Sequence, residues 1–241
     1  MQALTLALTR GIYTARLATS PQDMADSLAL RQICFRVGQS RSDADRFDAA
    51  CQHVLVKDGA DMVASFRIQT FAEIQTLSDS YTAQFYDLTP LQSIPGPKIE
   101  LGRFCLHPAH TDPDILRLAW GLLTQLVDQT KAKLLFGCSS FTEASPDKHL
   151  SALGYLAHHH LGPETFQPRH KSPEYIDLLA LADPHPAPAL PPLLKTYLTM
   201  GGWVSDHAVL DRDLDTTHVF VALDIAAIPA GRARALRALS G

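Results

Sequence analysis

Residues 98–107 read as a β-strand, and a long amphipathic helix follows them almost at once. The strand sequence Lys-Ile-Glu-Leu-Gly-Arg-Phe-Cys-Leu-His carries an acid, Glu100, and a cation, Arg103, three positions apart. Apolar residues then recur at helical spacing over 114–131, which predicts a helix with one buried face. A strand that leads into a helix N-terminus can hold a phosphate-bearing carrier beside a general base. This combination points to an acyltransferase.

Strands and helices alternate along the rest of the chain. The expected strands cover 13–18, 53–57, 62–70, 134–139, 175–181 and 219–225. The expected helices cover 20–35, 81–88, 149–158 and 193–200, and a basic tail helix follows residue 225. No glycine-rich dinucleotide turn or P-loop interrupts this order. The sequence therefore predicts an α/β fold of the α+β type, as one domain over 1–241 with an irregular proline-rich insertion near 183–192.

The composition limits the classes of partner. The 241 residues carry 21 Lys and Arg against 25 Asp and Glu, so a broad cationic surface for nucleic acid is not expected. No apolar run reaches the roughly 18 residues of a membrane span, and the N-terminus does not resemble a signal peptide. We therefore expect a cytoplasmic protein, with peripheral contact to a membrane through the basic tail near 232–237 left open.

The spacing of cysteine and histidine predicts no metal site. The cysteines form no C-x-x-C pair and are expected to be reduced, partly buried thiols: Cys34, Cys51, Cys105 and Cys138. Residues 158–160 are three consecutive histidines, which do not share one helix face and have no acidic partner at ligand spacing.

The acid and the cation of the first strand raise a question of geometry. Period-two alternation places Glu100 and Arg103 on opposite faces, unless a β-bulge near Gly102 breaks the alternation. Two interpretations stay open: an edge-strand salt bridge, or Glu100 as a base toward an amine with Arg103 as a substrate or loop anchor. Cys105 stands close by, but direct acyl transfer needs no covalent enzyme intermediate.

An acidic loop forms the second group of candidate residues. Asp43, Asp45 and Asp48 lie close together in a polar stretch, 38–50, that is expected to be a loop. Their spacing and the missing glycine do not fit a calcium-binding loop of the EF-hand type. The loop is either a solvated acidic segment or a site that receives the ammonium group of an amino acid.

Taken in order, these motifs resemble those of the ornithine lipid N-acyltransferases of the GNAT superfamily. The resemblance rests on 31–35, Asp45-x-Phe47-Asp48, 51–56, Ser65-Phe66-Arg67, Glu100-Leu101-Gly102-Arg103, 136–140 and a C-terminal signature over 190–219. It implies a GNAT-like fold, a splayed mixed central sheet flanked by helices. It also implies transfer of a 3-hydroxyacyl group from acyl carrier protein to the α-amine of ornithine, which gives lyso-ornithine lipid.

The resemblance further implies roles for single residues. Glu100 would be the catalytic base, and the substrate would be bound by Arg31, Asp45, Asp48, Arg67 and Arg103. The acyl and pantetheine arm would contact Phe104, Cys105, Leu106, His110 and Thr111. The glycine-containing pyrophosphate loop of the superfamily is replaced here by 107–113, which favours a carrier protein over coenzyme A. No resident cofactor or metal is expected, because the 4′-phosphopantetheine arrives on the carrier.

Three alternatives stay open. The acceptor is ornithine or glutamine, and the loop carboxylates favour ornithine because its δ-ammonium needs an anionic partner. The strand motif Glu-x-x-Arg-Phe is also distantly similar to that of acyl-homoserine lactone synthases, which would make the chain an enzyme of that kind. The third alternative is a non-catalytic module that binds acyl carrier protein and has kept the fold.

Overall fold

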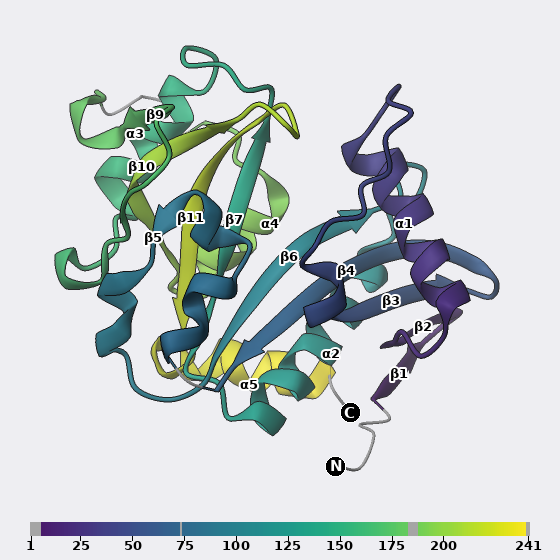
Figure 1. Ribbon diagram of the computed structural model, residues 1–241. Helices are drawn as coiled ribbons and strands as arrows, with labels where there is room; N and C mark the ends of the chain where they lie inside the picture. Colours follow the sequence, from purple (N-terminus) through teal and green to yellow (C-terminus); the bar gives the residue numbers. More distant parts are fainter. Residues whose placement is uncertain (1–5, 73, 183–187, 240–241) are drawn as a thin grey trace. The chain divides into compact units, whose positions relative to one another are not determined.

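The computed structural model describes residues 6–72, 74–182 and 188–239 (Figure 1). The chain divides into two compact units. The first unit takes Met1–Thr70, Leu101–Ala132 and Ala230–Gly241, and the second takes Phe71–Glu100 and Lys133–Pro229. The expectation of one folding domain over 1–241 stays a prediction. No helix among the described residues is long and apolar enough to cross a membrane.

The first unit is built on strands in the order β1-β2-β3-β4-β6, and the pairs from β1 to β4 are antiparallel. Their bounds are β1 (Ala7–Arg10), β2 (Tyr13–Leu17), β3 (Gln52–Asp58), β4 (Asp61–Phe71) and β6 (Lys98–Leu106), of which β6 contributes Leu101 onward. β3 and β4, both expected as strands, pair as an antiparallel hairpin. Val54, Leu55 and Val56 of β3 are all fully buried. Because consecutive side chains point to opposite faces, both faces of this strand are covered.

The helices of this unit are α1 (Pro21–Phe35), α2 (Pro113–Thr130) and α5 (Ala230–Leu239), with a 3-10 turn, η1 (Asp48–Ala50), between α1 and β3. α1 begins at a capping box, in which Ser20 accepts the N–H of Asp23 and the Asp23 carboxylate accepts the N–H of Ser20. α2 buries the apolar face that its spacing predicts, and α5 packs against it. Gly121 permits this contact, because a Cβ there would lie 2.7 Å from the carbonyl oxygen of Leu239.

The second unit contains a mixed sheet in the order β6-β7-β11-β10-β9. Its strands are the first three residues of β6, then β7 (Leu134–Thr142), β11 (Thr216–Asp224), β10 (Trp203–Asp211) and β9 (Tyr175–Asp177). β6 and β7 pair in parallel, from Lys98↔Leu134 to Glu100↔Phe136, whereas the other pairs are antiparallel. The predicted mixed sheet is therefore present.

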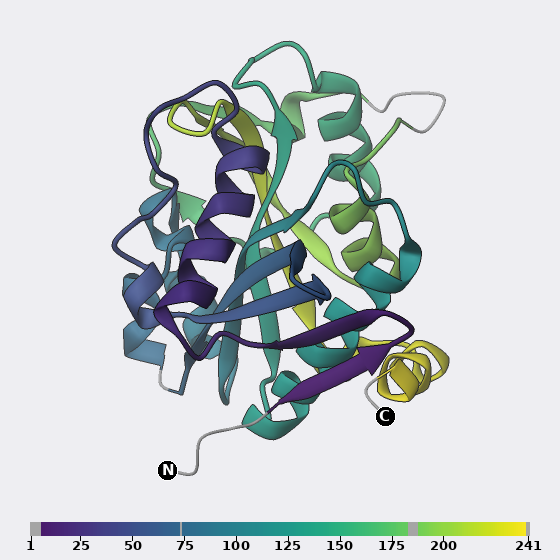
Figure 2. The same ribbon diagram turned by 90° about the vertical axis from the view of Figure 1, so that its right-hand side faces the viewer.

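Short elements cover one face of this sheet and two helices cover the other (Figures 1 and 2). The short elements are η2 (Ile74–Asp79), η3 (Thr82–Gln84), β5 (Tyr86–Asp87) and η4 (Thr89–Ser93). The helices are α3 (Leu150–His159) and α4 (Pro192–Thr199). η5 (Glu164–Phe166), β8 (Arg169–His170), η6 (Leu178–Ala180) and η7 (Ile225–Ala227) complete the unit, and β8 pairs with β5. Tyr86 and Leu91 pack with Phe136 and Phe220 in the core beneath the short elements.

Several elements differ from the sequence-based expectations. The helix expected over 81–88 is wrong: a single 3-10 turn is followed by the β5 strand. β1 and β10 were not expected. β10 lacks the apolar pattern of a strand because residues 205–207, which lie within it, are polar. The strand expected over 175–181 ends at Asp177. In the proline-rich stretch 183–192, residues 183–187 lie outside the described residues, and 188–191 form no helix or strand before Pro192 begins α4.

Candidate functional site

Charged side chains of the first unit form one ionic cluster, which we call the loop cluster: Arg31, Arg36, Asp43, Asp45, Asp48, Arg67 and Arg103. They come from α1, from the loop after it, from the start of η1, from β4 and from β6. Asp43 lies at its centre with a fully buried side chain. Its Oδ2 accepts hydrogen bonds from Arg31 Nε at 2.7 Å and Arg103 Nε at 3.0 Å. Its Oδ1 lies 3.3 Å from Arg36 Nε.

Arg67 joins the other two acids of the loop cluster. Its Nη1 donates to Asp45 Oδ1 and to Asp48 Oδ1, both at 2.6 Å, and its Nη2 donates to Asp45 Oδ2 at 2.8 Å. Arg31 Nη1 also donates to Asp48 Oδ1, at 2.7 Å. The acids are thus paired rather than solvated, because each accepts from a guanidinium that is itself almost fully buried.

These contacts favour the ionised forms of Asp45 and Asp48. Burial acts to raise the pKa of Asp48, but the bonds from Arg31 and the Asp45 backbone, with the charges of Arg31 and Arg67, lower it to about 2. For Asp45, burial also acts to raise the pKa, and the bonds and charge of Arg67 with the charge of Arg103 lower it. Asp45 is the most exposed of the three acids, with 21% of its side chain accessible against 12% for Asp48.

All five residues predicted to bind substrate therefore meet in the loop cluster. Their contact with a substrate stays a prediction. Arg36 was not a candidate residue, and Asp43 was a candidate of the acidic loop but not one of the five residues predicted to bind substrate, although both belong to the cluster. Asp43 stands in the same acidic run as Asp45 and Asp48, which is the signal that would have included it. Nothing in the sequence indicates which arginine pairs with which acid.

The strand that carries Arg103 departs from regular β geometry at that residue. Arg103 has φ +52°, in the left-handed region that non-glycine residues rarely adopt. Gly102, where the sequence allowed a bulge, is not among the positive-φ residues. Such a conformation costs about 1–3 kcal/mol and persists only where the surroundings enforce it. The hydrogen bonds from its guanidinium to Asp43 and Asp45 hold the side chain in place.

Glu100 belongs to the second unit, where it is 4% exposed. Its Oε1 accepts the backbone N–H of Thr82 at 2.7 Å, and its Oε2 accepts that of Tyr81 at 3.0 Å. These N–H groups lie at the start of η3, so the carboxylate caps this turn.

A buried Tyr–His pair lies in the same unit. The hydroxyl of Tyr86 donates to the backbone carbonyl of His218 at 3.0 Å and lies 3.2 Å from His218 Nδ1. This arrangement assigns the ring proton to Nδ1, which donates to the Tyr86 oxygen. Burial, followed by the influence of His207, lowers the pKa of His218 to about 3. His218 is therefore a neutral imidazole at ordinary pH.

The residues predicted to contact the acyl and pantetheine arm lie on β6 and in the loop after it: Phe104, Cys105, Leu106, His110 and Thr111. The ring of Phe104 stacks on Phe66, with centroids 5.1 Å apart. The carbonyl of Leu106 accepts a hydrogen bond from the Cys34 thiol at 3.3 Å. Their contact with an acyl donor stays a prediction.

Cys105 is a buried thiol. The hydrogen bond with the Cys34 thiol and then burial raise its pKa well above the ordinary range. Only the thiolate is an effective nucleophile. Cys105 is therefore unsuited to form an acyl-enzyme intermediate.

The start of α2 already holds carboxylates. Asp112 is its N-cap and accepts the N–H of Asp114 at 2.9 Å. Asp114 in turn pairs with Arg10 at 2.9 Å and Arg117 at 2.7 Å. A phosphate approaching this helix end would meet two acids and two arginines, so the backbone N–H groups alone would not hold it.

Comparison with known proteins gives relatives of one kind. A family model described as "Acetyltransferase (GNAT) domain" matches residues 33–121. The L-ornithine N(alpha)-acyltransferase of Rhodobacter capsulatus is 32% identical over 236 residues, which cover 90% of this chain and 91% of that protein. The protein of the same name from Brucella abortus is 32% identical over 76% of this chain and 70% of its own length.

Solved structures with the same fold are distant in sequence. FeeM, an N-acyl amino acid synthase from uncultured soil microbes, superposes with a TM-score of 0.54 at 10% identity, over 89% of this chain and 92% of that one. The loading GNATL domain of CurA from Lyngbya majuscula gives a TM-score of 0.52 at 15% identity, over 90% and 99%. These likenesses concern the fold.

Replacing Arg31 by Gln should destabilise the protein by about 3–5 kcal/mol, because Asp43 and Asp48 would keep buried charges with too few partners. Urea unfolding of the purified variant measures this. Arg212→Gln, which breaks an exposed pair with Glu174, is the matched control and should change little. Equal losses in the two variants would contradict the cluster's structural role.

His218 should make stability depend on pH below neutrality. Its pKa is lower in the folded protein, at about 3, than in an unfolded chain, so the unfolded state binds the proton more readily. The contribution of neutral His218 to the free energy of unfolding is fully present above about pH 6.5. It falls by about 1.4 kcal/mol per pH unit as the pH drops toward the pKa of His218 in the folded protein. Urea unfolding of the His218→Gln variant should show a flatter profile between these limits. An unchanged slope would show that His218 does not titrate in this way.

Proposed function

The chain belongs to the L-ornithine N(alpha)-acyltransferase family and has the GNAT acyltransferase fold, and from this premise we propose how it acylates the α-amine of L-ornithine. One observation carries the assignment of activity: the relative of that name matches 90% of the chain at 32% identity. The position of Glu100 on β6 supports its assignment as the catalytic base.

The proposed donor is a 3-hydroxyacyl group on acyl carrier protein, and the proposed product is lyso-ornithine lipid. No resident cofactor is proposed, because the phosphopantetheine arm belongs to the donor. The segment 107–113 supports this choice over coenzyme A, because it contains no glycine. In addition, the first backbone N–H of α2, that of Asp114, already donates to the side chain of Asp112. Arg10 and Arg117 are the cations beside that helix start, where one phosphate of the arm would need them.

In the proposed mechanism, the neutral α-amine attacks the thioester carbonyl carbon. The C–N bond forms, the C–S bond breaks, and the pantetheine sulfur leaves as a thiolate that takes a proton from solvent. Glu100, directly or through a water molecule, takes the proton that the amine loses, and a backbone N–H of β6 stabilises the oxyanion. The backbone N–H groups of Tyr81 and Thr82 hold the Glu100 carboxylate in one orientation, which favours such a transfer.

The amino acid would be held by the loop cluster. Arg103 belongs to this cluster and stands three residues after Glu100 in the sequence of β6. Four arginines face three aspartates there, so the surplus positive charge would attract the α-carboxylate. Asp45 is the candidate partner of the δ-ammonium because it is the most exposed acid. Arg31, Arg67 and Asp48 would position these groups.

Glutamine is the second candidate acceptor. The argument from loop charge, which favoured ornithine, is weaker in the structure because Asp43, Asp45 and Asp48 each already accept from arginine. The names of the relatives, rather than this charge, support ornithine. The assays below also test the other two alternatives. Product from S-adenosylmethionine would indicate acyl-homoserine lactone synthesis, and no product from any amine would indicate a non-catalytic role in binding acyl carrier protein.

Peripheral contact with a membrane is part of the proposal, because the product is a lipid. α5 supports it with the exposed arginines Arg232 and Arg234, whereas Arg237 is paired with Asp128. Basic side chains on a surface helix attract anionic headgroups.

Purified protein with 3-hydroxyacyl carrier protein should convert ornithine to its N-acyl product, detected by mass, with less product from glutamine and none from S-adenosylmethionine. Glu100→Gln should lower kcat by about a hundredfold to ten-thousandfold, the usual effect of losing a general base. No product from any amine would contradict the assignment as an enzyme. Full activity of Glu100→Gln would contradict the assignment of Glu100 as the base.

A control is needed because Glu100 also caps η3. Asp87 caps the next turn in the same way, accepting the N–H of Thr89 at 2.9 Å. Asp87→Asn should therefore leave kcat near the wild-type value. If Asp87→Asn and Glu100→Gln lost activity equally, Glu100 would act through the loop rather than as a base.

Asp45→Asn should raise KM for ornithine about tenfold or more, because a charge-assisted bond to the δ-ammonium would be lost. KM for glutamine should change less, since glutamine carries no second ammonium. Asp26→Asn is the matched control, because Asp26 also forms an ion pair in the first unit, with Lys57 at 2.9 Å. Equal effects of Asp45→Asn on both acceptors would assign Asp45 to holding Arg67 alone.

A further inference from the structure

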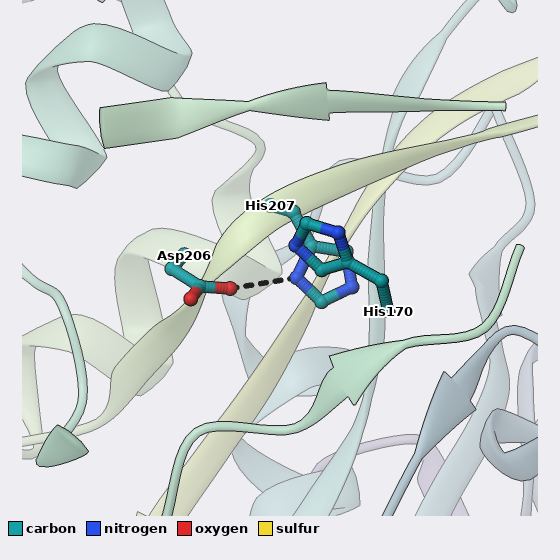
Figure 3. A group of neighbouring side chains, drawn as sticks. All are labelled: His170, Asp206 and His207. Atoms are coloured by element: carbon teal, nitrogen blue, oxygen red, sulfur yellow. Dashed lines mark hydrogen bonds and ion pairs between the residues drawn. The ribbon is translucent and has the colours of Figure 1, made fainter. Parts of the chain in front are cut away.

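His170, Asp206 and His207 bring three metal-ligand side chains together in the second unit (Figure 3). One ring nitrogen of each histidine and one carboxylate oxygen lie within 4.8 Å of one another. His207 Nδ1 lies 2.7 Å from Asp206 Oδ1, and the two imidazole rings have centroids 4.1 Å apart. His170 is on β8 and the other two are on β10, so the group is formed by tertiary structure.

The backbone of β10 is irregular at this place. Its register against β11 shifts between Val204 and Ala208, which indicates a β-bulge. A regular strand would send the side chains of Asp206 and His207 to opposite faces. In the observed structure the carboxylate of Asp206 instead reaches the ring of its neighbour.

Side chains outside the strand ladder hold this bulge. Ser205 Oγ donates to the carbonyl of His207 at 2.6 Å and accepts the N–H of Phe220 at 3.1 Å. Gln167 Oε1 accepts the N–H of Asp206 at 3.1 Å, and its Nε2 donates to the carbonyl of Val204 at 3.2 Å. An irregularity with this much support places its side chains reproducibly.

His207 is poorly satisfied as a purely structural residue. Its side chain is almost fully buried, yet its Nε2 has no hydrogen-bond partner among the described residues. Buried polar atoms in folded proteins nearly always have partners, so each exception calls for an explanation. The ring of Tyr86 lies beside it, with centroids 5.0 Å apart.

The open side of the group faces solvent. His170 is exposed and Asp206 is partly exposed, which gives an ion a route of entry. Tyr175 packs on the His170 ring, with centroids 4.2 Å apart, and so limits its orientations.

We propose that His170, Asp206 and His207 form a binding site for a divalent transition-metal cation of the zinc class. Two imidazole nitrogens with one carboxylate suit zinc, cobalt or nickel rather than calcium or magnesium, which prefer oxygen ligands. Each histidine supplies one ring nitrogen and Asp206 one carboxylate oxygen, and any proton on the nitrogen that binds is released to solvent. Zinc bonds of about 2.0–2.2 Å require the three ligand atoms, which lie within 4.8 Å of one another, to draw closer when the ion binds.

The site joins β8 to β10, so an ion there would tie the short β5–β8 pair to the main sheet of the unit. It leaves Glu100 and the loop cluster untouched. The inference therefore stands or falls separately from the proposed acyl transfer.

The test is binding of Zn²⁺ and Co²⁺ alone to the full chain without a histidine tag, in competition with a coloured chelator. Wild type should bind one ion, show visible Co²⁺ absorption and melt at a higher temperature with Zn²⁺. His170→Ala should weaken binding at least tenfold and abolish the rise in Tm, and Asp206→Asn should weaken it in the same direction. Mg²⁺ and Ca²⁺ should have no effect.

His159→Ala is the matched control, because this exposed histidine belongs to the run 158–160 and offers the obvious competing site. It should bind as wild type does. His170 is also exposed, so its removal should leave the fold intact, which circular dichroism verifies. Wild-type affinity in His170→Ala, loss of binding in His159→Ala, or no binding by wild type would each overturn the proposal.

Discussion

The first unit depends on one buried charge, the carboxylate of Asp43. An isolated ion in that position would be strongly unfavourable, so its partners must be present for the loop to fold. Arg31 reaches it from α1 and Arg103 from β6, and both approach the same oxygen. The acidic loop is thereby tied at once to a helix and to a strand that are distant in sequence. Asp45 and Asp48 are placed as a result, with Arg67 between them.

This arrangement also explains why β6 is irregular. The left-handed backbone of Arg103 is unfavourable by itself, and the two carboxylates that hold its guanidinium compensate for it. Glu100 stands three residues earlier on the same strand, with its own contacts to a 3-10 turn. The two charges that drew attention in the sequence thus have different partners, and neither is the simple edge-strand pair that was the plainer interpretation.

Local patterns made much of this structure predictable. The periodicity of α2, the helix α1 and the strands β3 and β4 depend on residues close in sequence, and all were expected. The members of the loop cluster were also candidates, apart from Arg36. The pairing of acids with arginines was not expected, because it is decided by tertiary contacts. β10 was missed because its bulge buries polar residues, and the partners of Glu100 were missed because the turn at 81–82 has no sequence signature.

The cap that Glu100 places on η3 has a consequence for the timing of catalysis. The carboxylate holds the N–H groups of Tyr81 and Thr82 most strongly while it is ionised. In the proposed mechanism the carboxylate becomes neutral when the acyl group is transferred, and its hydrogen bonds to the turn then weaken. The proton taken from the amine would therefore loosen the segment beside the base in each cycle, and loss of that proton to solvent would reset it.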